Sequence, residues 1–351
     1  ARVADHPGLT LIEADILDCA ETLENCIAAS DVVFHLAAAV GVELVVRDPV
    51  RTITTNVHGT ENVLKLTAKY NRRVIVASTS EVYGKSTNPL FSETDDLLIG
   101  SPFHSRWSYA CSKLLDEFYV MAFHRSTGMP GTVVRFFNTV GPRQTGMYGM
   151  VIPRFVGRAL RGEPLQVYGD GTQSRCFCHV ADVVRALQLL VGRTESCGQI
   201  YNIGRQRLIT IEELAHLVIE RTGSRSAIEF VPYEKAYAKG FEDMQRRMPD
   251  TAAIHALTGW KPERLMDTLA HAVIGGLFFS RSGVRAVKHP TGKPFWRDWT
   301  FWAAAGFGSM PDLASFGVHF CGMLFSGELR EMLRRFLAGD VMAAAPPVET
   351  L

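Results

Sequence analysis

Tyr109 and Lys113 are the residues of this chain whose types and spacing most directly suggest chemistry. Residues four apart share one face of a helix, so the lysine ammonium can lie beside the phenol. A phenol has a pKa of about 10 in water, and a neighbouring positive charge lowers that pKa towards a value useful to a general base. The same spacing also occurs on ordinary solvated helix faces, so the pair by itself is weak evidence of a proton-transfer site.

Hydroxyl side chains follow a strand-like run that precedes this pair. Residues 73–77 are mostly β-branched, and Ser78, Thr79 and Ser80 come directly after them. In an open parallel sheet, ligands bind beyond the carboxyl ends of the strands, so Thr79 and Tyr109 are predicted to meet at one substrate hydroxyl. The alternative is a turn whose hydroxyls only satisfy its own backbone.

Charge and cysteine content narrow the class of protein. The chain has 351 residues, a formal net charge of +1 at pH 7 and no basic stripe, so neither nucleic acid nor a membrane surface is an expected partner. Seven cysteines in a chain of this size lack the dense framework of a small secreted domain. They favour a reducing compartment, and we expect a cytoplasmic protein.

Short apolar runs alternate with longer amphipathic segments along the chain. We expect strands at residues 10–15, 31–36, 73–77 and 132–137, and helices at residues 54–70, 108–126 and 211–222. That alternation is typical of a parallel α/β sheet covered by helices. Residues 303–327 carry few charges but include proline, aspartate and several glycines, so we interpret them as buried or partner-facing rather than membrane-spanning.

Several short motifs occur along the chain in a fixed order. They are His35-Leu36-Ala37-Ala38, Thr55-Asn56-Val57-His58-Gly59-Thr60, Tyr109-x-x-x-Lys113, Arg135-Phe136-Phe137-Asn138-Thr139-Val140-Gly141-Pro142-Arg143, Val167-Tyr168-Gly169-Asp170-Gly171 and Arg247-Met248-Pro249-Asp250. Together they resemble the extended short-chain dehydrogenase/reductase family, and within it the NAD-dependent epimerases, dehydratases and decarboxylases of nucleotide sugars. The similarity runs from about Asp15 to about Pro262.

The resemblance implies a Rossmann-type, doubly wound parallel sheet with a smaller substrate-binding lobe. We expect one unit over residues 1–275, with the Rossmann part mainly at 1–140 and 172–205, the substrate lobe mainly at 141–171 and 206–275, and an unassigned extension at 276–351. In the family, a first βαβ unit carries a glycine-rich phosphate loop and an acidic residue for the adenosine ribose. Neither is found here, so we expect an N-terminally truncated sequence that binds NAD weakly and leaves the strand edge at residues 32–36 unpaired.

The family's catalytic roles carry over to the positions that match its motifs. Tyr109 would take the proton of a sugar hydroxyl while NAD takes the hydride, Lys113 would hold the nicotinamide ribose, and Thr79 would hydrogen-bond the same sugar oxygen. Ser80 and Glu81 match the residues beside the reacting sugar. The resemblance therefore implies an enzyme that oxidises a sugar carbon to a ketone.

The resemblance also implies binding residues for both ligands. Cofactor contacts are expected from Asp15, Ile16, Ala37, Ala38, Asn56, Ser78, Tyr109, Lys113, Phe137 and Val140. Nucleotide-sugar contacts are expected from Asn138, Tyr168, Arg175 and Arg247. Arginine offers planar, bidentate donors to phosphate oxygens, which suits the two arginines to a diphosphate. The apolar positions are equally well explained as core, whereas Asp15 is discriminating because a carboxylate at a strand end needs a donor.

The segment Cys176-Phe177-Cys178-His179 contains residue types that bind zinc, but these residues are not spaced as in a zinc site. Alternate side chains of a strand point to opposite faces, and no second cysteine pair stands at a suitable spacing. We therefore expect no metal. His35, at the end of a predicted strand, is expected to be structural rather than catalytic.

Residues after Thr79 separate the activities of the family. Ser80-Glu81 and Arg247-x-Pro249-Asp250 resemble the UDP-glucuronate decarboxylases, and serine in place of aspartate argues against a 4,6-dehydratase, which needs an acid for the leaving hydroxyl. Arg106-Trp107-Ser108-Tyr109 resembles nucleotide-sugar epimerases. The sequence favours 4-epimerisation of a UDP-sugar. Decarboxylation and an inactive binding remnant stay open as alternatives.

Members of the family pair through two helices from each subunit. The matching segments here are residues 54–70 and 108–126. Four such helices would pack into a shared bundle, so we expect a homodimer.

Overall fold

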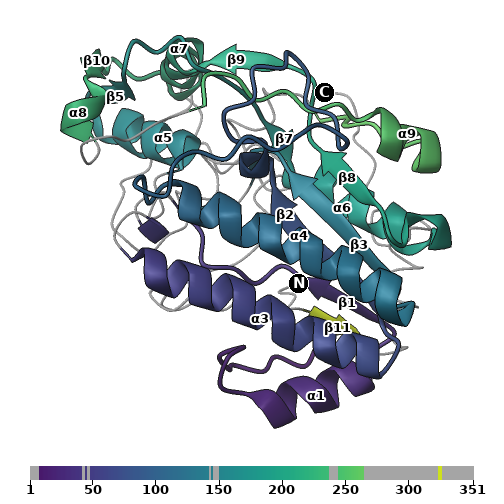
Figure 1. Cartoon of the computed structure of the whole chain (residues 1–351). Coiled ribbons are helices and arrows are strands. Elements are labelled where there is room, and N and C mark those ends of the chain that lie inside the picture. The colour runs from purple at the N-terminus through teal and green to yellow at the C-terminus, as the bar shows by residue number, and fades with distance from the viewer. Residues whose placement is uncertain are drawn as a thin grey trace.

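A five-stranded sheet forms the centre of the molecule (Figure 1). The computed structural model describes residues 8–41, 44–45, 48–141, 144, 150–236, 244–264 and 323–325. The strand order is β11-β1-β2-β3-β8, with bounds β11 (Met323–Phe325), β1 (Val32–His35), β2 (Arg73–Thr79), β3 (Gly131–Phe136) and β8 (Ile200–Ile203). The last four strands run parallel, and β11 pairs antiparallel at the edge beside β1.

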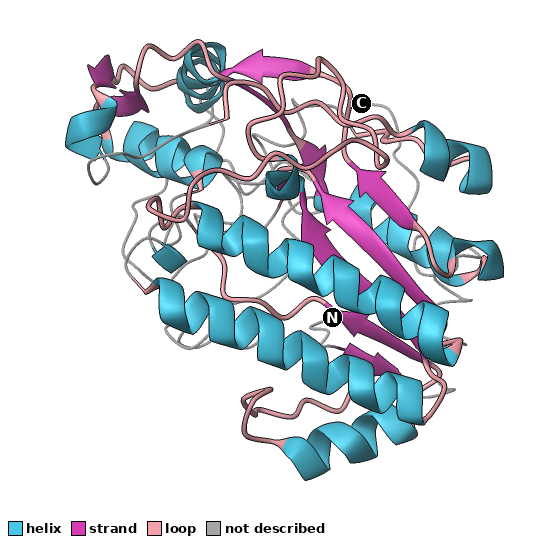
Figure 2. Ribbon diagram, in the orientation of Figure 1, coloured by secondary structure: helices cyan, strands magenta, loops and turns pink. Residues whose placement is uncertain are grey.

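Helices connect the parallel strands and cover both faces of the sheet, as Figure 2 shows. The connecting helices are α3 (Pro49–Lys69) after β1, α4 (Trp107–Thr127) after β2 and α6 (Val180–Val191) before β8, and α1 (Ala20–Ala28) lies against α3. Parallel neighbours joined by crossover helices are the defining feature of a Rossmann-type α/β fold. The predicted fold class is therefore confirmed.

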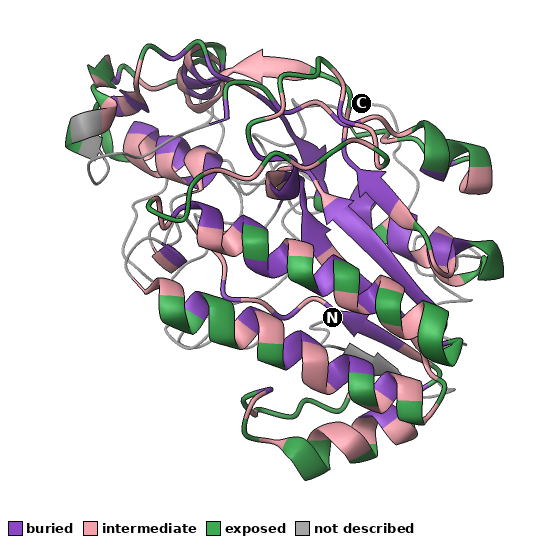
Figure 3. Cartoon of the chain, viewed as in Figure 1, coloured by how far each residue is buried: buried purple, intermediate pink, exposed green. Residues whose placement is uncertain are grey.

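The alternation of side chains along each strand explains the two covered faces. Val33 and Val74 pack with side chains of α1, α3 and α4. Their sequence neighbours Phe34 and Ile75 point the other way and pack with α6 and α9 (Ala252–Thr258). Successive residues of a strand face opposite sides of a sheet, so a run that is apolar at every position must be covered twice. Figure 3 shows this continuous burial through the sheet.

A smaller group of elements lies beyond the carboxyl ends of the main strands. Its strand pairs are β5 (Leu165–Tyr168) with β10 (Ile228–Val231), β6 (Ser174–Cys176) with β9 (Leu208–Thr210), and β4 (Thr139–Val140) with β7 (Cys178–His179). Its helices are α5 (Val151–Arg161), α7 (Ile211–Thr222) and the short α8 (Tyr233–Ala236). One hydrophobic cluster joins α5, α7 and β5. The chain also forms two short 3₁₀-helices, η2 (Ser80–Tyr83) and η3 (Thr194–Ser196).

Helix α7 shows how local sequence sets the bounds of an element. The Thr210 side chain accepts a hydrogen bond from the Glu213 backbone N–H, and the Glu213 carboxylate accepts one from the Thr210 N–H. This reciprocal pair satisfies donors that a helix N-terminus leaves unpaired. Gly223 ends the helix in the left-handed region, with φ of 62°. The predicted helix at residues 211–222 is confirmed.

Most expected elements occur where the sequence predicts them, and two expectations are wrong. Residues 10–15 form no strand; Asp15 instead belongs to a turn in which its carboxylate accepts from the Leu17 N–H at 2.9 Å. The edge of β1 is not left unpaired, because Val32 faces Phe325 of β11. Apart from residues 323–325, the 303–327 stretch lies outside the described residues. Within the described ranges, no helix is both long and apolar enough to cross a membrane.

Candidate active site

Thr79 and Tyr109 meet at the carboxyl end of β2. Thr79 ends that strand and caps η2, where its hydroxyl accepts a hydrogen bond from the Glu81 N–H at 3.2 Å. Helix α4 begins at Trp107, so Tyr109 lies in its first turn, and its phenol hydrogen-bonds to Thr79. Two hydroxyls from separate elements can therefore contact one oxygen of a ligand placed beyond the strand end.

The surroundings of Tyr109 favour its neutral phenol in this structure. Burial raises the pKa of Tyr109 above its usual value, and the Glu81 and Asp116 carboxylates raise it further. The hydrogen bond from Thr79 and the charge of Arg247 act in the opposite direction and are outweighed. Tyr109 therefore needs a further positive charge before it can act as a base near neutral pH.

Lys113 does not provide that charge in the way the sequence predicts. Its ammonium lies 2.7 Å from Asp116 Oδ2, and both side chains are buried. The ammonium forms an ion pair with this carboxylate, one turn further along α4, because a buried charge must be paired. The expectation that Lys113 lowers the pKa of Tyr109 is therefore wrong for this structure, in which burial and the two carboxylates raise it.

Glu81 lies between two arginines beside Tyr109. Arg106 Nη1 is 2.7 Å from Glu81 Oε2, and Arg247 Nη1 is 3.2 Å from Glu81 Oε1. Burial raises the pKa of Glu81, but the two guanidinium groups outweigh it and hold the pKa at about 2. Glu81 is thus an ionised acceptor at neutral pH and not a proton donor.

The same cluster contains one residue that the sequence did not predict, Arg106, and one that it predicted at a different ligand group, Arg247. Arg106 was not predicted as a site residue, although it stands three positions before Tyr109 in a motif shared with the family. Arg247 was predicted on a diphosphate and here contacts Glu81. Sequence spacing could not pair Glu81 with Arg247, since 166 positions separate them.

Backbone pairing fixes Arg247 next to η2. The Phe91 N–H donates to the Met248 carbonyl at 2.8 Å, and the Asp250 N–H donates to the Phe91 carbonyl at 2.8 Å. The Phe91 ring stacks on Tyr83 of η2, with 4.6 Å between ring centroids. The segment that carries Arg247 is therefore attached to the same short helix that carries Glu81.

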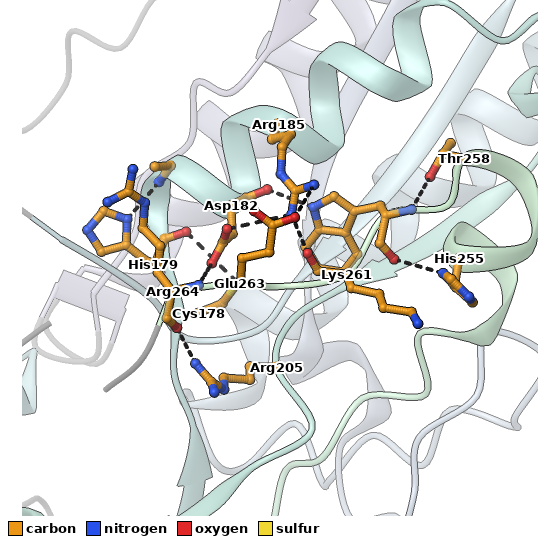
Figure 4. A network of polar contacts seen from close by, with 12 residues as sticks. Cys178, His179, Asp182, Arg185, Arg205, His255, Thr258, Lys261, Glu263 and Arg264 are labelled. Atoms are coloured by element: carbon orange, nitrogen blue, oxygen red, sulfur yellow. Dashed lines mark hydrogen bonds and ion pairs between the residues drawn. The ribbon is translucent and has the colours of Figure 1, made fainter. Parts of the chain in front are cut away.

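A polar network anchors the chain that follows this segment, as Figure 4 shows. The Trp260 indole N–H donates to the Asp182 carbonyl at 2.9 Å, and the Arg264 N–H donates to the Asp182 carboxylate at 3.0 Å. Arg185 of α6 pairs with Glu263 at 2.9 Å. These contacts hold residues 260–264 against α6, so the chain from residue 248 to residue 264 is held at both ends.

Ser78 belongs to a buried ionic network behind the site. Its hydroxyl donates to the Glu117 carboxylate of α4. Arg135 of β3 binds both oxygens of that carboxylate, through Nε at 3.0 Å and Nη2 at 2.7 Å, and its guanidinium lies over the Tyr83 ring. A contact of Ser78 with the cofactor stays a prediction.

The expected cofactor residues after β1 are held by Asn56 of α3. Its side-chain oxygen accepts from the Ala39 N–H at 2.7 Å, and its amide donates to the Ser112 hydroxyl of α4 at 3.0 Å. The small residues Ala37 and Ala38 follow β1 after Leu36, and Ala37 is buried. Contacts of Ala37, Ala38 and Asn56 with NAD stay predictions.

The remaining expected cofactor residues are less informative. Ile16 lies in the core against Gly59, where a Cβ would come within 3.1 Å of the isoleucine. Asp15 is exposed and its carboxylate is used in a local turn. Phe137 and Val140 are buried in hydrophobic clusters, which agrees with their alternative interpretation as core residues. Contacts of these four residues with NAD stay predictions.

The expected nucleotide-sugar residues lie on separate elements of the smaller group. The Arg154 guanidinium of α5 lies over the Tyr168 ring, 4.4 Å from its centroid. Arg175 of β6 is buried and donates to the Ser174 carbonyl at 2.9 Å. The Asn138 carbonyl accepts from the Cys178 N–H at 3.0 Å. Their contacts with a nucleotide sugar also stay predictions.

Cys176, Cys178 and His179 are used structurally. Burial raises the pKa of each of the two thiols to about 12, so neither is a thiolate at neutral pH. His179 caps α6 by accepting from the Ala181 N–H at 3.0 Å. Across the described part of the chain, no three His, Cys, Asp or Glu residues are grouped to hold a metal ion.

Comparison with known proteins identifies the family. Residues 1–204, more than half of the chain, match the NAD dependent epimerase/dehydratase family. The chain belongs to this family. Its members use NAD, and NAD is the cofactor of this fold.

Similar proteins in this family act on nucleotide sugars. The chain is 42% identical over 256 residues to a UDP-N-acetyl-alpha-D-glucosaminuronate decarboxylase from Bacillus cytotoxicus, covering 73% of this chain and 78% of that protein. It is 35% identical to UDP-glucuronic acid decarboxylase 4 from Arabidopsis thaliana, covering 74% of this chain but only 55% of the relative. Among solved structures, UDP-glucose 4-epimerase from Thermotoga maritima superposes with a TM-score of 0.68 at 30% identity, covering 76% of this chain and 84% of that one. The chain is therefore an NAD-dependent nucleotide-sugar enzyme of the epimerase/decarboxylase type.

Proposed function

We propose that this protein removes carbon dioxide from a UDP-linked hexuronic acid through a 4-keto sugar. The observation that carries the proposal is the position of Arg247, which contacts Glu81 beside Tyr109. A guanidinium at this place can bind a sugar carboxylate with two parallel hydrogen bonds. The decarboxylases among the similar proteins support the same choice.

The residues at the end of β2 and the start of α4 have clear tasks in such a reaction. Tyr109 accepts the proton of the sugar C4 hydroxyl, and Thr79 orients that oxygen. Bound NAD would supply the hydride acceptor and donor that chemistry at C4 needs. The C4 ketone is β to the carboxylate on C5, so the electrons of the breaking C5–C6 bond pass into the carbonyl as carbon dioxide leaves. Hydrogen bonds from Tyr109 and Thr79 stabilise the resulting enolate oxygen, and C5 takes up a proton.

Glu81 limits how firmly a substrate carboxylate is held. With a pKa of about 2, Glu81 stays ionised and shares Arg247 with any second carboxylate. An arginine that fully neutralised the substrate would stabilise the bound acid and slow the loss of its carboxylate. The shared arginine binds the substrate and still allows carbon dioxide to leave.

A second candidate is 4-epimerisation of a neutral UDP-sugar, which the sequence favours. It needs oxidation at C4, rotation of the keto sugar and return of the hydride to the other face, all with the same Tyr109 and Thr79. The arrangement of Glu81 supports this candidate because Arg106 and Arg247 already satisfy it without a substrate carboxylate. The similarity to a solved UDP-glucose 4-epimerase points the same way.

One experiment separates these candidates. The protein is incubated with NAD and, in separate samples, UDP-glucuronate, UDP-N-acetylglucosaminuronate, UDP-glucose and UDP-N-acetylglucosamine. The products are analysed by NMR together with trapped carbon dioxide. Release of carbon dioxide from a uronate supports decarboxylation. Epimer exchange of a neutral sugar without carbon dioxide supports the second candidate. Failure to convert any of the four contradicts both and favours a binding remnant.

Replacement of Arg247 tests the observation that carries the proposal. Arg247→Met should reduce kcat/KM for the uronate by about 10–100-fold, because a charged hydrogen bond contributes about 1.5–3 kcal/mol. Arg246→Met is the matched control, since Arg246 is the exposed neighbour of the same type. Equal kinetics for the two variants would remove Arg247 from substrate binding.

We also propose a homodimer formed through α3 and α4. The two helices lie side by side, and their outer surface carries exposed apolar side chains, among them Ile53, Leu115 and Phe118. Phe118 is 61% exposed, so its burial in a partner would stabilise a dimer by about 1.5–3 kcal/mol per subunit. Phe118→Glu should shift light scattering towards the monomer, whereas Phe103→Glu, on the exposed loop before α4, should leave it unchanged. A wild-type monomer at micromolar concentration would contradict the proposal.

A further inference from the structure

Asp116 is a buried carboxylate beside the catalytic residues that the chemistry above does not use. Its side chain is 0% exposed and lies 2.7 Å from the ammonium of Lys113, which is 2% exposed. Tyr109, Lys113 and Asp116 follow one another along α4 at intervals of four and three residues, so all three share one face of the helix. The ammonium therefore contacts a carboxylate on the helix face that also carries Tyr109.

A polar chain from two other elements supports the carboxylate. The Thr60 hydroxyl of α3 favours the ionised form of Asp116 and also lies 2.9 Å from His35 Nε2 of β1. A hydroxyl has one hydrogen, so a Thr60 that donates to Asp116 accepts from His35, which requires the histidine proton on Nε2. Burial and the charge of Lys113 lower the pKa of His35 to about 3, so the histidine is neutral.

The pair between Lys113 and Asp116 is close but not strongly favoured. Burial raises the pKa of Asp116, and Lys113 and Thr60 oppose that effect only in part, while Glu117 adds to it. Taking two charges out of water has a large cost that their attraction offsets only with good additional hydrogen bonds. The ammonium of such a pair can leave its carboxylate when another set of acceptors, such as ribose hydroxyls, comes within reach.

We propose that Asp116 is a positioning residue that holds the Lys113 ammonium away from Tyr109 and releases it when NAD binds. Cofactor binding is thereby coupled to activation of the base. The inference rests on the proposed function only for the role of Tyr109 in turnover. The contact between Lys113 and Asp116 is independent of which sugar reacts.

Other charges near Tyr109 set the background for this exchange. Glu81 opposes loss of the phenol proton, and Arg247 favours it. Glu81 is itself paired with Arg106 as well as Arg247. None of these three groups contacts Asp116 in the described structure. Replacing Asp116 therefore removes its own effect on the pKa of Tyr109 and leaves the effects of Glu81, Arg106 and Arg247 in place.

The test follows the ionisation of Tyr109 directly. Tyrosine labelled with carbon-13 at Cζ reports its own titration by NMR, and Tyr109→Phe identifies the signal among the nine tyrosines. Asp116→Asn keeps the size of the side chain and removes its charge. In this variant the Tyr109 titration should begin about one pH unit lower, since a negative charge is lost and Lys113 is no longer neutralised.

Two further variants show whether the effect comes from this pair. Thr60→Val keeps the volume of the side chain and makes the ionised form of Asp116 less favourable. It should therefore shift the Tyr109 titration to lower pH, as Asp116→Asn does, but by a smaller amount. Glu61→Gln, at the next residue on α3, removes a half-buried carboxylate paired with Lys65 and should leave the Tyr109 titration unchanged. Saturating NAD should lower the Tyr109 titration in the wild type and lower it less in Asp116→Asn.

Each outcome decides the proposal. An unchanged Tyr109 titration in folded Asp116→Asn would overturn it, as would a wild-type titration that saturating NAD does not move. The acid limb of the pH profile of kcat/KM should move with the NMR titration. If no nucleotide sugar is converted, the proposed function fails, yet the NMR titrations still decide whether Asp116 holds Lys113.

Discussion

Tyr109→Phe is expected to reduce turnover by about 10²–10⁴-fold while leaving nucleotide-sugar binding nearly intact. The variant loses only the hydroxyl that hydrogen-bonds to Thr79 and takes the substrate proton. Steady-state kinetics gives the loss of turnover, and calorimetric titration with the nucleotide sugar gives the binding. The ring of Phe fills the same space, so the fold should be unaffected.

Tyr119→Phe is the control for this prediction. Tyr119 lies on the same helix and packs against the hydrophobic cluster on the α3 side of the sheet. Its loss of a hydroxyl should change turnover less than about twofold, within the small effect of a substitution away from the reacting groups. Near-normal turnover in Tyr109→Phe would exclude this residue as the base.

Arg135→Leu is expected to lower the free energy of unfolding by about 3–5 kcal/mol. Arg135 and Glu117 form a bidentate pair whose side chains are 3% and 4% exposed. Removing the arginine leaves the carboxylate buried with the Ser78 hydroxyl as its remaining described donor. Urea denaturation followed by circular dichroism measures the loss.

An exposed ion pair provides the matched comparison. Lys65 and Glu61 lie 2.8 Å apart on α3, but the lysine is 60% exposed. Lys65→Leu should change the free energy of unfolding by less than about 0.5 kcal/mol, because water already screens the pair. A similar small change for Arg135→Leu would show that the buried network is not needed for stability.

The loss of turnover expected for Tyr109→Phe and the loss of stability expected for Arg135→Leu both involve contacts of neighbouring residues at the end of β2. Ser78 donates to Glu117 of the buried network, whereas Thr79 hydrogen-bonds to Tyr109 at the site. Both partners lie on α4, with Tyr109 in its first turn and Glu117 further along, so one short segment contacts the site and the buried network at once. The ionic network therefore fixes the strand end that presents Thr79.

Local patterns determined most of the secondary structure. The β-branched run at residues 73–77 and the amphipathic segment at residues 108–126 gave β2 and α4, because alternation and helical periodicity are local properties. Residues 10–15 have a strand-like composition but form no strand in the described structure. A strand also needs a neighbour to pair with, and β1 is paired with residues 323–325 instead.

The sequence by itself also predicted most side chains of the candidate site, although not Arg106. The resemblance to the family predicted roles for Tyr109, Lys113 and Thr79, and helical periodicity placed the first two on one helix face. Tertiary structure decided their electrostatics. The pKa of Tyr109 and the partner of Lys113 depend on burial, and Glu81 meets Arg247 only because distant segments pack together. Burial and long-range contact are properties of the folded chain, and they decide which charges are paired.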